Sequence, residues 1–333
     1  MTREYIVPGN LLLAGEYAIT AEGGLGIALA PARFLRLRAV PGSRFLLEGQ
    51  AHGAALDGGR LAEAVLAAAA EILSVPVSDK RFAARVFADS TELFFAPGKK
   101  LGLGSSAALA VGLAAFFVDC IHPLGPEPSP EECEPVLRIA LRGHRAFQSG
   151  GSGYDVHASF YGGTGLFRGG EKPLWNPIRI ADGMELTLIP AEESVRSGPA
   201  VRSFKKLQAE RGVDVARFLA CSNRAVRHLE AALTAGAGQA GDGQIRGPSA
   251  CALFRAITGV RRVGLWIGRN LGLDPEGGQL AGVLADLRTR GIPAKASGAG
   301  GELAIAFGFP PVYYSPEVEV FSVKLARDGV RWR

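Results

Sequence analysis

A glycine- and serine-rich segment at residues 101–109 has the residue types that bind anions. Gly102 and Gly104 precede Ser105 and Ser106 at the start of a strongly apolar run. Glycines let the backbone approach phosphate oxygens closely, and the first N–H groups of a helix have no intrahelical partner and lie at the positive end of its dipole. The serine hydroxyls add ligands for phosphate or Mg²⁺. We therefore predict a phosphate-binding loop made of Gly102, Leu103, Gly104, Ser105, Ser106 and Ala107, with Lys99 beside it.

Two other interpretations of this segment are open. Ser105 or Ser106 could be an ordinary N-cap of a core helix. The glycines also fit a loose dinucleotide-binding fingerprint, but residues 97–100 separate them from the preceding strand, which that motif should follow at once. A Walker A loop is excluded because no Gly-Lys-Ser/Thr occurs in the chain. Two glycines followed by paired serines favour phosphate binding.

Two further glycine-rich segments, 7–18 and 295–302, could each be explained as turns. Taken with 101–109, in this order and at these distances, they resemble the three signature motifs of the GHMP kinase superfamily, which includes galactokinases and homoserine, mevalonate and phosphomevalonate kinases. The resemblance spans nearly the whole chain. It implies ATP and Mg²⁺ as cofactors, with the second motif wrapping the ATP phosphates and Ser106 acting as a metal ligand.

The resemblance also implies the fold class, α+β with two domains. The amino-terminal domain, residues 1–176, would be similar to domain 2 of ribosomal protein S5. The carboxyl-terminal domain, residues 177–333, would be ferredoxin-like, with ATP and substrate in the cleft between the domains. Composition favours a boundary in the same region, because the proline- and tryptophan-bearing segment 172–177 lies between two expected strands.

Among the subfamilies, residues 144–163 look most like phosphomevalonate kinase, which has a similar histidine, glutamine and Gly-Ser-Gly-aromatic-Asp-Val run. Mevalonate kinase has a metal-binding glutamate near the place of His144. The resemblance implies ATP-dependent transfer to 5-phosphomevalonate, giving 5-diphosphomevalonate in the mevalonate pathway of isoprenoid biosynthesis. One alternative is a mevalonate kinase or another sugar or alcohol kinase of the superfamily. A second is a catalytically silent protein that binds a nucleotide or metabolite as a regulator.

The resemblance implies substrate contacts from residues of the first and third motifs and of the 144–163 stretch. They are Asn10, Glu16, Tyr17, Ser152, Gly153, His157, Ser297, Gly298, Ala299 and Gly300. Two positions depart from the family pattern. Asn10 stands where the first motif usually has a lysine, and Glu302 stands where the third motif usually continues with a glycine and an aspartate. A cation beside the transferred phosphoryl group must therefore come from elsewhere.

Asp155 is the candidate catalytic carboxylate, with an ordinary helix N-cap as the alternative. In an alcohol kinase such an aspartate accepts the hydroxyl proton, whereas a phosphate monoester is already mostly dianionic at neutral pH. A phosphate acceptor needs cations instead, and four basic residues flank the turn at 197–200: Arg196, Arg202, Lys205 and Lys206. We expect Lys205 and Arg196 to act in catalysis, and a solvated helix face is the alternative. His144 and His157 are expected to pack or hydrogen-bond rather than to bind zinc.

The elements that must position these residues follow from hydrophobic periodicity and from glycine and proline breaks. Strands are expected at 5–7, 11–14, 27–30, 33–40, 81–88, 91–95, 162–168, 184–190, 302–307 and 318–324. Helices are expected at 60–73, 106–118, 130–148, 199–211, 215–235, 249–271 and 279–290. A glycine- and alanine-rich surface loop is expected at 235–247.

Length and composition limit the remaining possibilities. The 333 residues suffice for two domains, and 47% hydrophobic with 21% charged residues is typical of a folded, soluble protein. The net charge of +5 is not concentrated in one run, and the longest apolar run, 107–118, is too short to span a membrane. The four cysteines are typical of cytosolic thiols. We expect a cytoplasmic monomer or homodimer that binds a small phosphorylated or hydroxylated acid, without nucleic-acid or membrane partners.

Overall fold

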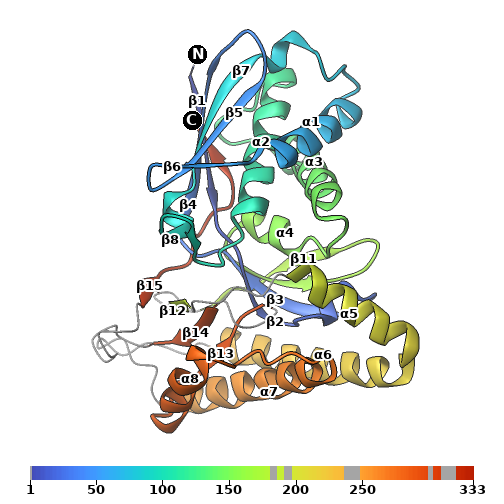
Figure 1. Ribbon diagram of the computed structural model, residues 1–333, viewed down its shortest axis with the longest axis vertical. Helices are drawn as coiled ribbons and strands as arrows, with labels where there is room; N and C mark the ends of the chain where they lie inside the picture. Colours follow the sequence, from blue (N-terminus) through green and yellow to red (C-terminus); the bar gives the residue numbers. More distant parts are fainter. Residues whose placement is uncertain (1, 181–185, 191–196, 236–247, 299–302, 309–319) are drawn as a thin grey trace. The chain divides into compact units, whose positions relative to one another are not determined.

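The computed structural model describes residues 2–180, 186–190, 197–235, 248–298, 303–308 and 320–333 (Figure 1). It divides into two compact units. The first unit comprises residues 1–10, 30–163 and 326–333, and the second comprises 11–29 and 164–325. This division differs from the expected single boundary after residue 176, because the strand at 164–168 pairs with the strand at 25–29 in the second unit and also with the strand at 174–177.

The first unit contains a six-stranded sheet of order β16-β1-β4-β7-β5-β6. Its strands are β1 (Arg3–Pro8), β4 (Phe34–Pro41), β5 (Leu46–Ala51), β6 (Ala54–Leu56), β7 (Ala84–Asp89) and β16 (Arg331–Trp332). Strand β4 confirms the expected alternation, since Leu35, Leu37 and Ala39 are buried while Arg36 and Arg38 are exposed. All neighbours pair antiparallel except β5 and β7, which are parallel.

The helices of the first unit are α1 (Gly59–Ile72), α2 (Ser105–Ile121), α3 (Pro130–Gln148) and α4 (Tyr154–Tyr161). Helix α2 lies against β1 and β4 and is covered by α1 and α3 (Figure 1), so its almost wholly apolar sequence is buried around most of its circumference. Helix α3 begins with Pro130 behind a capping box between Ser129 and Glu132. Helices α1, α2 and α3 confirm the helices expected at 60–73, 106–118 and 130–148.

One expectation for the first unit was wrong, and some of its elements were not expected. The expected strand at 91–95 is a 3₁₀ turn, Thr91–Leu93, that leads into a short hairpin of β8 (Phe94–Ala96) and β9 (Lys99–Lys100). Helix α4, which contains Asp155, was not among the expected helices. Strand β16 had no sequence signal of its own, and it forms by pairing with β1, with Trp332 opposite Tyr5.

The second unit contains two antiparallel four-stranded sheets. One has the order β11-β10-β3-β2, from Leu174–Pro177, Thr164–Arg168, Leu25–Leu29 and Leu11–Ala14. The other has the order β13-β14-β12-β15, from Ala294–Ala296, Leu303–Phe307, Leu186–Pro190 and Phe321–Val323. The segment 172–177, expected as a domain boundary, therefore contains a strand, β11.

The helices of the second unit are α5 (Ser197–Glu210), α6 (Gly212–Thr234), α7 (Pro248–Asn270) and α8 (Gln279–Thr289), close to the four expected ones. Helices α6 and α7 run side by side, α6 contacting β3 and α7 contacting β13 (Figure 1). Helix α8 packs on β13 and β14 through Leu280, Leu284 and Leu287. The loop expected at 235–247 lies, except for Ala235, outside the described residues. Among the helices that the structure describes, none combines the length and apolarity needed to cross a bilayer.

Helices α1 and α3 approach so closely that one glycine between them is required. A Cβ added to Gly143 on α3 would lie 2.7 Å from Cα of Val65 on α1. We predict that Gly143→Ala lowers the free energy of unfolding by about 1–3 kcal/mol, because backbone atoms must move apart. Gly259→Ala is the control, since nothing lies within 4 Å of its added Cβ on α7, and it should raise stability by about 0.5–1 kcal/mol. Urea denaturation of both variants would contradict the prediction if both were stabilised equally.

Candidate active site

The glycine- and serine-rich loop before α2 is anchored by its leucines. Leu101 and Leu103 are buried, whereas Gly102, Gly104 and the serines are half-buried. The backbone N–H of Leu101 donates to the carbonyl of Leu93, and the carbonyl of Leu103 accepts from the backbone N–H of Asn10. The alternation thus fixes the loop to the core while its glycines and serines stay accessible.

Helix α2 begins without a side-chain cap. Its N-cap residue is Gly104, with φ 62° and ψ 42°, and within the described chain no side chain accepts a hydrogen bond at this cap. Gly102 also has a positive φ of 72°. The alternative that Ser105 or Ser106 is the N-cap is therefore wrong. The first N–H groups of α2 are left with the positive end of the dipole of a 17-residue helix, as an anion site requires.

Asn10 holds this loop from the side. Its side-chain amide donates to the Gly104 carbonyl at 3.1 Å and to Oγ of Ser159 on α4 at 3.0 Å. Only 1% of the residue is exposed. A Cβ added to Gly104 would lie 2.0 Å from Oδ1 of Asn10. Asn10, which stands where the first motif usually has a lysine, is therefore buried and connects the loop to α4 by hydrogen bonds.

Helices α2, α3 and α4 bring four polar side chains together at the loop. Oγ of Ser106 lies 3.2 Å from Nε2 of His144, and Nε2 of Gln148 lies 3.1 Å from the same ring nitrogen. Nδ1 of His144 lies 3.6 Å from Oδ2 of Asp155. Asp155 occupies the first turn of α4 and its N-cap is Gly153, so the N-cap alternative for Asp155 is also wrong. The predicted pair Ser106 and Asp155 is thus linked by His144, which had been expected only to pack or hydrogen-bond.

The other predicted substrate residues around α4 have structural partners. Nδ1 of His157 donates to the Gly153 carbonyl at 2.8 Å, and burial lowers the pKa of His157, which favours its neutral form. Gly153 has φ 85°, a conformation that favours glycine. The Ser152 carbonyl accepts from Nη2 of Arg145 at 3.2 Å. Lys99, predicted beside the phosphate-binding loop rather than at α4, is exposed on β9, and its ammonium lies over the ring of Phe95.

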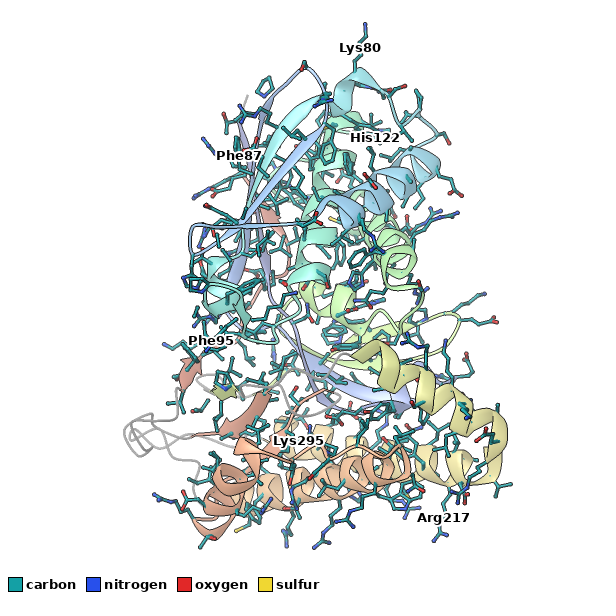
Figure 2. The ribbon with its side chains drawn as sticks, in the orientation of Figure 1. Lys80, Phe87, Phe95, His122, Arg217 and Lys295 are labelled. Atoms are coloured by element: carbon teal, nitrogen blue, oxygen red, sulfur yellow. The ribbon has the colours of Figure 1, made fainter. Side chains whose placement is uncertain are left out.

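In the second unit, the first and third motifs meet through a buried ion pair. Nζ of Lys295 on β13 lies 2.5 Å from Oε1 of Glu16, and the two side chains are 4% and 8% exposed. Oγ of Ser297 donates to the Leu12 carbonyl at 2.8 Å. Figure 2 labels Lys295 inside this unit, in contrast to the exposed Arg217 of α6. Sequence reasoning did not find Lys295, because 279 positions separate it from Glu16.

The remaining predicted residues of the second unit include one buried side chain, Tyr17, and one exposed side chain, Lys205. Tyr17 is buried against Phe204, and burial with the nearby Glu16 carboxylate raises the pKa of Tyr17 to about 12. Gly298 has φ 66°, with open space around it. Lys205 is exposed on α5. The predicted residues Arg196, Ala299 and Gly300, and the departure at Glu302, lie outside the described residues. Within the residues described, no group of three or more His, Cys, Asp or Glu side chains could hold a metal ion.

Residues 96–163 match the family described as the GHMP kinases N terminal domain. This match contains the loop, Ser106, His144 and Asp155. No curated protein matches the sequence. The match and the fold together confirm the resemblance to the GHMP kinase superfamily that the three glycine-rich segments indicated.

Solved structures with the same fold include GHMP kinases. A Lin0012 protein from Listeria innocua is 19% identical with a TM-score of 0.80, covering 100% of this chain and 99% of that one. Phosphomevalonate kinase of Streptococcus pneumoniae, in complex with phosphomevalonate and AMPPNP, is 16% identical with a TM-score of 0.69, covering 92% of each chain. L. major mevalonate kinase in complex with R-mevalonate is 19% identical with a TM-score of 0.65, covering 96% of this chain and 95% of that one. The chain therefore has the α+β fold of GHMP kinases.

The contact between Gly104 and Asn10 predicts a sharp cost for any side chain at Gly104. Gly104→Ala should lower stability both because its φ is positive and because Asn10 must leave its two hydrogen bonds. Gly98→Ala is the control, with φ 74° and nothing within 4 Å of the added Cβ. We expect Gly98→Ala to cost about 1–2 kcal/mol and Gly104→Ala about 1–3 kcal/mol more. Thermal unfolding of the two variants measures the difference, and equal losses would contradict the clash with Asn10.

The buried pair predicts a strong dependence of stability on Glu16. Glu16→Gln should cost roughly 3–5 kcal/mol, because it leaves the Lys295 ammonium buried without its counter-charge, and adding Lys295→Met should recover most of that loss. The exposed pair of Glu48 and Arg85, at 2.7 Å, provides the control. Glu48→Gln should cost less than about 1 kcal/mol. Urea denaturation would contradict the prediction if the losses from Glu16→Gln and Lys295→Met simply added.

Proposed function

We propose that this protein is an ATP- and Mg²⁺-dependent small-molecule kinase whose acceptor is a phosphorylated acid, 5-phosphomevalonate. The observation that carries the proposal is the uncapped start of α2, preceded by two glycines in left-handed conformation and followed by Ser106 in contact with His144. Such a site suits the phosphates of a nucleotide. The match of residues 96–163 to the GHMP kinases N terminal domain supports the same class of reaction.

The loop has the donors that a nucleotide phosphate requires. The N–H groups of the first turn of α2 and the accessible glycines of the loop would bind phosphate oxygens, and Ser106 would supply a hydroxyl ligand to Mg²⁺. Bound Mg²⁺ neutralises the charge that develops on the phosphates. Lys99 and Lys100, both exposed on β9 just before the loop, would add positive charge beside it.

The surroundings of Asp155 favour a phosphate acceptor over an alcohol. Its Oδ1 accepts from the backbone N–H of Val156 at 2.9 Å, and its Oδ2 faces the ring of His144. Oδ1 is thus hydrogen-bonded within the protein and Oδ2 lies beside a ring rather than free in solvent, which suits an acceptor that needs no strong base. The similarity of residues 144–163 to phosphomevalonate kinase supports the same assignment.

An ADP-release assay with mevalonate, 5-phosphomevalonate and galactose tests the proposal. We expect turnover with 5-phosphomevalonate alone, and omission of Mg²⁺ should abolish it. Turnover only with an unphosphorylated alcohol would assign the protein to the mevalonate or sugar kinases instead. ATP binding without turnover of any of the three acceptors would favour the catalytically silent regulator.

Lys205 of α5 and Arg196, which precedes α5 in the sequence, are proposed to neutralise the acceptor phosphate. Replacing Lys205 by Met should raise KM for 5-phosphomevalonate or lower kcat by at least about tenfold, a loss of ~1.4 kcal/mol in transition-state binding, with little change in ATP affinity. Arg196→Met should act in the same way. Lys206→Met is the control, since Lys206 lies 3.8 Å from Glu210 in an exposed pair. Steady-state kinetics unchanged in Lys205→Met and Arg196→Met would mean that the cluster is a solvated helix face.

A further inference from the structure

We propose that His144 is a positioning residue that orients the hydroxyl of Ser106 toward a cation at the loop, an inference that rests on the proposed function of this site. His144 comes from α3, Ser106 from α2 and Asp155 from α4, so three helices converge on one ring. The imidazole is 3% exposed, and its two nitrogens face different partners. Its contact with Ser106 suggests a role beyond packing.

The partners of the ring define its tautomer. Nε2 of Gln148 can only donate, and it lies 3.1 Å from Nε2 of His144. With the Gln148 amide in this orientation that ring nitrogen accepts, and the proton of the neutral ring is on Nδ1. Nδ1 faces the Asp155 carboxylate at 3.6 Å, where the negative charge favours the N–H. The Asp155 carboxylate thus favours the tautomer of His144 that has its proton on Nδ1.

The tautomer in turn orients Ser106. Nε2 of His144 has one lone pair, which the Gln148 amide and the Ser106 hydroxyl share, so the hydroxyl at 3.2 Å donates its proton to that nitrogen. Both lone pairs of the serine oxygen then remain available for another group. At the start of α2, where phosphates would gather, that group is a divalent cation. A serine without this acceptor could turn its proton toward the cation and repel it.

The alternative is that His144 only fills space between the helices. A buried ring with that role would be replaceable by an apolar ring at a cost in stability alone. The two cases differ in whether the effect of His144 requires Ser106. A double-mutant cycle between the two residues therefore separates them.

The experiment measures binding of the non-hydrolysable nucleotide AMPPNP by calorimetry, once with Mg²⁺ and once with EDTA. We expect His144→Phe to reduce the Mg²⁺-dependent gain in affinity by about tenfold, the loss of one interaction with a charged group. His144→Gln should recover most of it, since its side-chain oxygen can accept the same proton. In a Ser106→Ala background, His144→Phe should change the gain less than twofold. Gln148→Leu, at an exposed position, provides a second, milder variant should His144→Phe fail to fold.

Equal effects of His144→Phe with and without Ser106, or no recovery in His144→Gln, would overturn the proposal. Nitrogen NMR of the ring adds a readout that needs no nucleotide: the chain has 5 histidines, and the signal lost in His144→Gln must show a protonated Nδ1 and an unprotonated Nε2. The opposite tautomer would also overturn it. Wild-type protein that binds Mg²⁺ and AMPPNP but transfers no phosphoryl group would refute the proposed function and leave the role of His144 supported. Failure to bind AMPPNP would refute both.

Discussion

The amino-terminal end of helix α2 is the constraint on which the first unit depends. The helix is apolar and covered by the sheet and by α1 and α3, so its positive end must open where polar groups can reach it. Only glycine readily adopts the backbone of Gly102 and Gly104 that brings the chain into this end. Asn10 then hydrogen-bonds Gly104 of the loop, and His144 contacts Ser106 in the first turn of the helix. The accessible donors of the loop are therefore fixed in place before any ligand arrives.

In the second unit the corresponding constraint is the buried pair of Glu16 and Lys295. Two charges removed from water must stay together, so the segment after β2 and strand β13 are tied to each other. The first motif contributes to both units, since Asn10 belongs to the first and residues 11–18 belong to the second. A motif that looks like one turn in the sequence is therefore divided between the units: Asn10 contacts the loop of the first unit, and Glu16 pairs with Lys295 in the second.

The local elements could be predicted where burial and periodicity agree. Helices α1, α2 and α3 and the alternating strand β4 follow from patterns within their own residues. Elements that exist only through a partner could not be predicted. Strand β16 forms because β1 offers an unpaired edge, and β11 forms on β10 in a segment whose proline and tryptophan indicated a boundary. The wrong strand at 91–95 shows the same limit, because a β-rich composition does not exclude a 3₁₀ turn.

The sequence by itself determined the prediction that residues 101–109 bind phosphate, because glycine conformation, helix dipole and serine hydroxyls are local properties. It also determined the family resemblance, which depends on the order of three short motifs. Only the tertiary structure decided which groups Asn10 and His144 contact. The partners of Asn10 are up to 149 positions away and those of His144 up to 38, and hydrogen bonds are made by atoms that meet in space, whatever their distance along the chain.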